Sequence, residues 1–226
     1  MRFIDKTISP VELTEWIRVQ TEAKIEVNFG VFQNPEKKAL KQYLLDEQKY
    51  ICCYCEQEVK LDSTIVVEHF LPQSRFKKHE LDYYNLHIAC THSNKHCDTV
   101  KGDELIVNLL LHPNCAFYFK YSPTGEILPN THEFKNFAEF KANISNLKFR
   151  FQAVVHLISV LDLNNLQLIE ERKKTINDLM SVKDTQFDTL AKIEDYLDRE
   201  TAKTKSSRFP SLIEYLLNHQ KTKVEI

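Results

Sequence analysis

The stretches "ICCYCEQ" at residues 51–57 and "CTHSNKHCDTVKG" at residues 90–102 hold five of the six cysteines of this 226-residue chain. The first stretch has the C-x-x-C spacing with which a tight turn directs two thiolates at one Zn²⁺ ion. The second stretch supplies another pair, and four thiolates together close a tetrahedral site of the structural kind. The sequence therefore predicts a structural zinc site whose ligands are Cys52, Cys55, Cys90 and Cys97.

The second cysteine pair is separated by six residues, which is wider than a zinc knuckle usually allows. Two alternatives therefore stay open, because Cys53 could replace a member of the first pair, and His92 or His96 a member of the second. A redox C-x-x-C motif is less favoured, since no βαβ pattern lies beside it. Cys115 stands apart from the others and is expected in the core.

The composition is that of an ordinary globular protein and not of a nucleic-acid-binding polycation. Hydrophobic residues make up 42% of the chain and charged residues 27%, with only three glycines. So few glycines argue against a Gly-rich phosphate loop. No apolar run approaches the roughly 18–20 residues of a membrane span, and no signal-peptide core is visible, so we expect a cytoplasmic protein without membrane contact. The net charge of −2 means that phosphate binding requires a local basic patch or a basic partner.

Helical patterns flank the cysteine-rich segment. Residues 10–24 carry an apolar stripe that includes Trp16, and residues 35–48 open with proline at a favoured first-turn position. Within the centre, the β-branched segment 63–70 predicts a strand, and the aromatic segment 114–128 predicts a hairpin.

The C-terminal part is predicted to be helical from about residue 133 onward. The expected helices span residues 134–160, 164–180, 184–205 and 210–220. We therefore predict a mostly helical α+β protein. Its expected parts are an N-terminal helical segment (1–49), a zinc-stapled core (50–130) and a C-terminal helical region (131–226).

The segment between the cysteine pairs places ionisable residues at a strand end. Glu68 and His69 follow an apolar run and precede Leu71-Pro72, and burying such a pair costs free energy unless the pair has a function. Asn85 directly precedes the next apolar run. The order C-x-x-C, acid-His-x-x-Pro, Asn-Leu and Cys-x(n)-Cys-Asp-x-x-Lys-Gly resembles the HNH endonucleases, which are built on a ββα-metal core.

Over residues 52–103, the chain is similar to one group of these enzymes, the PtuB family of HNH subunits from Septu-type and retron-associated antiphage systems. A weaker likeness continues into the C-terminal helices. The resemblance implies an endonuclease that acts as the effector of a defence complex. The implied partners are an ABC-type ATPase of the PtuA kind and, in retron systems, a reverse transcriptase with its RNA and DNA.

The resemblance also implies a role for each motif residue. His69 would be the general base that activates water, and Asn85 would hold the imidazole or the loop behind it. Glu68 and Asp98 would be oxygen ligands of a catalytic Mg²⁺ or Mn²⁺ ion. The third HNH position is usually His or Asn, so Asp98 is a departure. Thr99, one residue later, is the alternative occupant.

A modest basic rim is expected around the motif to contact phosphates. Its members are Arg75, Lys77, Lys78, Lys95 and Lys101. Lys101 could instead be a structural part of the short helix that follows the second cysteine pair. No motif for reading bases is visible, so the sequence does not separate DNA from RNA as the substrate. The rival function is a zinc-stabilised adapter with a degenerate nuclease site.

Overall fold

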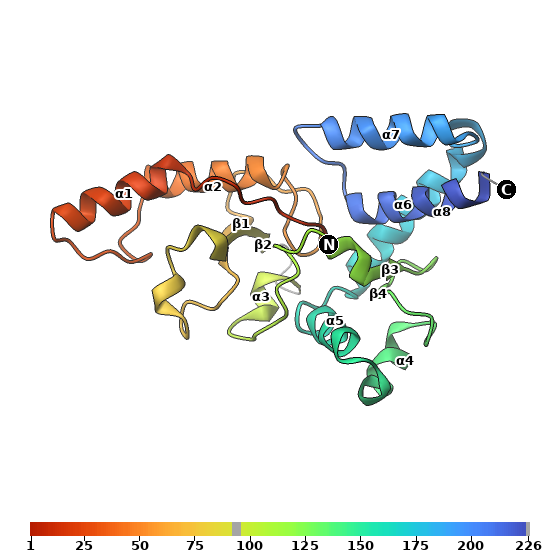
Figure 1. Ribbon diagram of the computed structural model, residues 1–226, viewed down its shortest axis with the longest axis horizontal. Coiled ribbons are helices and arrows are strands. Elements are labelled where there is room, and N and C mark those ends of the chain that lie inside the picture. Colours follow the sequence, from red (N-terminus) through yellow and green to blue (C-terminus); the bar gives the residue numbers. More distant parts are fainter. Residues whose placement is uncertain (92–95, 225–226) are drawn as a thin grey trace.

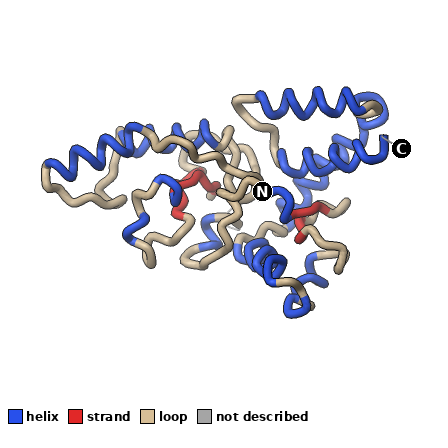
Figure 2. Tube along the Cα trace, viewed as in Figure 1, coloured by secondary structure: helices blue, strands red, loops and turns tan. Residues whose placement is uncertain are grey.

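The computed structural model describes residues 1–91 and 96–224, apart from the side chains of residues 184, 185, 223 and 224 (Figures 1 and 2). About half of the chain is helical, and the described strands form two small antiparallel sheets. The α+β class predicted from the sequence is therefore confirmed. No helix in the described part of the chain combines the length and the apolar character that a bilayer crossing requires.

The N-terminal segment contains two helices, α1 (Val11–Glu22) and α2 (Glu36–Glu47), each preceded by a proline. They pack together, and α2 contributes fully buried leucines to the core. Trp16 of α1 lies edge-on against Phe32, with ring centroids 4.9 Å apart. The indole therefore packs partly against the core of the protein.

The centre of the molecule consists of two paired strands followed by a short helix (Figure 1). Strand β1 (Ile65–His69) pairs antiparallel with β2 (Leu86–Cys90), and Glu68 stands opposite His87 in the register. The connecting loop carries two short 3-10 helices, η1 (Lys77–His79) and η2 (Tyr83–Asn85). Helix α3 (Asp98–Lys101) follows.

A second hairpin consists of β3 (Phe119–Tyr121) and β4 (Ile127–Pro129). The predicted hairpin is present, but its first residues form a 3-10 helix, η4 (Cys115–Tyr118). Gly125 in the turn has φ +93°, and a Cβ placed there would lie 2.3 Å from the carbonyl oxygen of Ile169. The buried guanidinium of Arg172 donates to the Gly125 oxygen at 2.7 Å, which ties the turn to the helix behind it.

The C-terminal region is helical, as predicted, but is divided differently. Its elements are α4 (Phe137–Ala142), η5 (Ile144–Asn146), α5 (Phe149–Val160), α6 (Leu166–Gln186), α7 (Leu190–Ala202) and α8 (Pro210–Val224). The prediction of one continuous helix over residues 134–160 is wrong, because the segment is divided into α4, η5 and α5. The side chain of Asn143 donates to the Glu139 oxygen at 3.0 Å and closes α4 there. Thr189 caps the start of α7, which therefore begins later than predicted.

One large apolar core connects the parts of the chain. It includes fully buried residues from each of the three predicted segments, such as Leu44, Ile88 and Leu157. A smaller cluster joins α6, α7 and α8, and its buried members are Leu179, Phe187, Ile193, Ile213 and Leu217. The paired strands β1 and β2 thus pack against this core, which fixes the positions of the side chains at the strand ends.

Candidate metal centre and active site

The four predicted zinc ligands meet at one point. One sulfur atom from each of four buried cysteines lies within 4.8 Å of the others. The Sγ atoms of Cys52 and Cys97 are 3.8 Å apart, and those of Cys55 and Cys90 are 3.6 Å apart. A tetrahedral zinc site with bonds of ~2.3 Å requires sulfur separations of roughly 3.8 Å. These cysteines therefore form a cluster that can hold a metal ion such as zinc.

Three elements bring the cysteines together. The first pair lies in a tight turn, in which the Cys52 amide donates to the Gln57 oxygen at 2.9 Å and Glu56 has a left-handed φ of 61°. Cys90 ends β2, and its amide donates to the Cys52 sulfur at 3.3 Å. Cys97 directly precedes α3. The cluster therefore connects the turn, the strand end and the helix start.

Burial and the neighbouring thiols shift the pKa values of the clustered cysteines in opposite directions. Burial opposes ionisation of Cys52, but hydrogen bonds from the neighbouring thiols outweigh it and bring the pKa of Cys52 well below its ordinary value. Burial raises the pKa of Cys97 well above its ordinary value. Metal binding displaces thiol protons, so a bound cation would favour the thiolate form of these buried cysteines.

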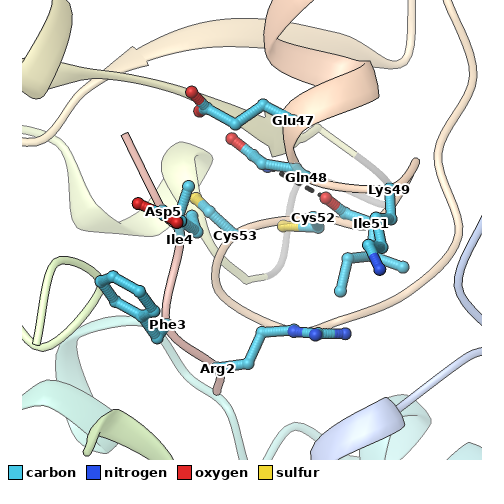
Figure 3. A pocket seen from close by; sticks show the side chains of 10 residues that line it. All are labelled: Arg2, Phe3, Ile4, Asp5, Glu47, Gln48, Lys49, Ile51, Cys52 and Cys53. Carbon is cyan, nitrogen blue, oxygen red and sulfur yellow. Dashed lines mark hydrogen bonds between the residues drawn. The ribbon is translucent and has the colours of Figure 1, made fainter. Parts of the chain in front are cut away.

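Among the described residues, those considered as alternative zinc ligands do not belong to the group of four sulfur atoms. His96 is fully buried, and its Nδ1 atom is 3.1 Å from the Cys97 sulfur. Cys53 does not belong to the group of four and lines, with its neighbour Cys52, a cavity of about 240 Å³ (Figure 3). His92 lies outside the described residues. Cys115 is buried in η4, as expected for a core thiol.

The two predicted ligands of the catalytic metal lie next to each other. Glu68, near the end of β1, is 4% exposed. Burial and the adjacent Asp98 carboxylate raise the pKa of Glu68, the nearby Lys101 opposes the rise, and the result is a pKa of about 8. Tyr54 donates to the Glu68 Oε1 atom at 2.8 Å. Strand β1 and helix α3 thus bring two carboxylates together, and Thr99 is exposed on the next position of α3.

His69 has a defined tautomer. Its Nε2 atom lies 3.0 Å from the backbone oxygen of Glu80. A carbonyl oxygen only accepts hydrogen bonds, so Nε2 carries the hydrogen and Nδ1 is the basic nitrogen. Phe29 contacts the imidazole edge-on, at 4.5 Å between ring centroids. Burial lowers the pKa of His69 below its ordinary value, which leaves the imidazole neutral near pH 7.

Asn85 fixes the loop that follows β1. Its Oδ1 atom accepts from the Leu71 amide at 2.6 Å, and its Nδ2 atom donates to the Leu71 oxygen at 3.2 Å and to the His79 oxygen at 2.9 Å. Of the two roles considered for Asn85, these contacts correspond to holding the loop. The loop in turn supplies the Glu80 carbonyl that orients His69.

The basic rim differs from the expected set. Lys101 is only 2% exposed, and its Nζ atom lies 2.8 Å from the Glu68 Oε1 atom and donates to the His69 oxygen at 3.3 Å. Assigning Lys101 to a phosphate-binding surface is therefore corrected, because the ammonium group is enclosed and already paired. The exposed basic side chains on the β1–β2 loop are Arg75, Lys77 and Lys78. Lys95 lies outside the described residues.

Several residues of the site were missed in the sequence. Tyr54 lies between cysteines, and only the turn of the knuckle brings its hydroxyl to Glu68. His87 is fully buried opposite Glu68, and neither ring nitrogen has a hydrogen-bond partner among the described residues. Burial lowers its pKa well below the ordinary value. Glu80 contributes its backbone oxygen, which lies against the His69 imidazole, and a sequence pattern does not reveal such a backbone contact.

Together, the described side chains offer a cluster of four cysteines for one metal and, at the end of β1, a neutral imidazole and a pair of adjacent carboxylates. Such a set can accept a proton from water and can bind a hard divalent cation. A scan against models of known protein families finds no match for the chain, and a search of curated proteins finds no relative.

Proposed function

We propose that the chain is a zinc-stabilised, metal-dependent endonuclease of the HNH type, which hydrolyses phosphodiester bonds in nucleic acids. The observation that carries this proposal is the arrangement at the end of β1. There, the carboxylates of Glu68 and Asp98 lie next to each other, and His69, the following residue of β1, offers Nδ1 as its basic nitrogen. The sequence motif over residues 52–103 supports the same function.

In this proposal, His69 is the general base. Its Nδ1 atom removes a proton from the attacking water, and its Nε2–H group remains bonded to the Glu80 oxygen. That carbonyl fixes the tautomer and stabilises the imidazolium ion that forms. Asn85 acts indirectly, because its three hydrogen bonds hold the loop that carries Glu80.

The carboxylate pair fits a hard divalent ion. Magnesium is usually held by one or two carboxylates, with water and substrate phosphate as its other ligands. The neighbouring Asp98 carboxylate raises the pKa of Glu68, and a bound cation would relieve the repulsion between the two groups. A magnesium or manganese ion held by Glu68 and Asp98 would stabilise the negative charge that develops on the phosphate and the leaving oxygen.

Zinc would have a structural role. It would be bound by the four clustered cysteines and would fix Cys97, the residue directly before Asp98. Because the same cluster contains Cys90 at the end of β2, the metal would hold the helix start against the sheet. The geometry of the carboxylate pair therefore depends on the zinc site.

The partner proposal rests on the resemblance and on charge. A rim of Arg75, Lys77 and Lys78 offers few phosphate contacts, and the net charge of the chain is −2. We propose that an ABC-type ATPase of the PtuA kind captures the substrate, with a reverse transcriptase and its nucleic acids as a further component in retron systems. The clustered reduced cysteines are compatible with a cytoplasmic location.

Cleavage assays test the proposal. Purified protein, alone and with the ATPase, would be given plasmid DNA and RNA in the presence of Mg²⁺ or Mn²⁺. His69→Ala is the catalytic variant, and His112→Ala is the control at a histidine outside the site. We expect cleavage by the wild type and the control but not by His69→Ala. Equal behaviour of all three proteins under every condition would contradict a nuclease.

A zinc-stabilised adapter is the second candidate, and one observation favours it. The Glu68 carboxylate already has a lysine and a tyrosine hydroxyl as partners, so its negative charge is partly satisfied without a catalytic metal. An adapter would form the complex with the ATPase and would retain that binding in the His69→Ala variant, while no cleavage would be observed with the wild type.

A further inference from the structure

A second cavity, of about 490 Å³, lies between α8, the hairpin region and the N-terminal residues. Helix α8 and strand β3 lie side by side at this point (Figure 1). Glu214, Tyr215, Asn218 and His219 line the cavity from one face of α8, as their spacing of three and four residues requires. The residues proposed for catalysis do not line it.

Aromatic rings form much of this cavity. Phe117 is 73% exposed at its wall, which is unusual for so large an apolar side chain. Tyr215 is half-buried and packs against Tyr121, with ring centroids 5.6 Å apart. An exposed ring beside a supported ring provides surfaces on which a flat heterocycle can stack.

Polar groups in the same cavity have capacity for a ligand. Arg2 lines both this cavity and an adjacent one, where its guanidinium donates to the Ser206 Oγ atom at 3.2 Å, and it has no carboxylate at ion-pair distance among the described residues. A guanidinium group in such a position favours a phosphate or carboxylate. The side chains of Glu214 and Asn218 make no hydrogen bond to the described residues, so a carboxylate and an amide remain available for the edge of a base.

We propose that this cavity binds a nucleotide, with the base stacked on Phe117, its polar edge against Asn218 and Glu214, and its phosphate at Arg2. The volume lies within the range of small-molecule sites, about 300–1,000 Å³. Glu214 only accepts hydrogen bonds when ionised, so it selects bases with an exocyclic amino group. The nucleotide is either free or part of a single strand. The proposal does not depend on the nuclease function.

Binding measurements on the full-length protein without added divalent ions test the proposal separately from cleavage. Saturation-transfer NMR would report binding of AMP, GMP, CMP and UMP, and fluorescence anisotropy would report binding of a short labelled single-stranded oligonucleotide. Phe117→Ala and Arg2→Met are the test variants. Phe149→Ala is the matched control, because Phe149 is 83% exposed and does not line the cavity.

We expect binding of the amino-bearing nucleotides, weakest binding of UMP, and an affinity about tenfold lower in Phe117→Ala, since stacking on one ring contributes this much. Phe149→Ala should behave as the wild type. Binding of the oligonucleotide alone assigns the cavity to a strand, and binding of mononucleotides alone assigns it to a free nucleotide. Absence of both, or equal affinities of Phe117→Ala and the wild type, would overturn the proposal.

Discussion

Lys101 and Glu68 form an ion pair inside the protein, with 2.8 Å between Nζ and Oε1 and side-chain exposures of 1% and 5%. The pair joins the short helix α3 to strand β1. It therefore fixes the distance between the two elements that carry the carboxylates of the proposed active site. An ammonium group in this place also limits the negative charge of the carboxylate pair.

Removing the lysine should destabilise the protein strongly. Above a pH of about 8, where Glu68 is ionised, Lys101→Met leaves a buried carboxylate without its counter-charge, which costs about 3 kcal/mol of the free energy of unfolding. Lys77→Met, at an exposed position, is the control. Urea denaturation measures both variants, and the double variant Lys101→Met/Glu68→Gln should recover part of the loss. Equal stability of Lys101→Met and Lys77→Met would show that the buried pair has no structural role.

The amide of Asn85 should be needed for the order of the β1–β2 loop. Asn85→Ala removes three hydrogen bonds to the backbone of Leu71 and His79, and we expect a loss of about 2–3 kcal/mol because buried polar groups lose their partners. Hydrogen exchange of the Leu71 amide should accelerate more than exchange in α5. Asn146→Ala, at an exposed position, serves as the reference, and unchanged exchange at Leu71 would contradict the role of Asn85.

Metal analysis should find one zinc per chain, held by the four clustered cysteines. Cys52→Ser and Cys90→Ser should each lose the metal and unfold the centre of the protein, since binding and folding are coupled. Cys53→Ser and Cys115→Ser should retain one zinc, because these thiols lie outside the cluster. A Cys90→Ser variant that melts like the wild type would contradict a structural role for the zinc site.

The dependence of cleavage on pH should reflect the lowered pKa of His69. The protonated imidazole cannot accept a proton, so kcat/KM should fall as the pH decreases through that pKa. Burial lowers the pKa below the ordinary histidine value of about 6.5, and a nearby divalent cation lowers it further. The acid limb should therefore have its midpoint below about 6.5. In assays saturated with Mn²⁺, which keeps the Glu68 carboxylate ionised, a midpoint above that value would assign the base to another group.

The sequence predicted features that depend on local patterns. Prolines at 35 and 210 mark the starts of helices, and β-branched residues mark β1. The clustering of cysteines predicted the thiolate cluster, because metal sites impose spacing on the chain. The break at Asn143 was missed, since its capping bond competes with a helical pattern that is otherwise continuous.

Contacts between distant segments could not be predicted in this way. The burial of Lys101 depends on how α3 packs against β1, and a lysine in a helix is most often exposed. The Tyr54 hydroxyl reaches Glu68 only because the cysteine-bearing turn folds back over the sheet. The expected Asp98 and Glu68 do lie together, whereas the backbone partner of His69 left no signal in the residue pattern.

The most direct test of the central claim compares two adjacent positions of α3. Asp98 belongs to the carboxylate pair, whereas Thr99 is exposed. Nucleic-acid cleavage would be measured with Mn²⁺ for Asp98→Ala, Thr99→Ala and the wild type, each with its zinc content determined. We predict that Asp98→Ala retains zinc but loses cleavage by about 100-fold or more, while Thr99→Ala remains active. Full activity of zinc-loaded Asp98→Ala would contradict a catalytic metal held by this pair.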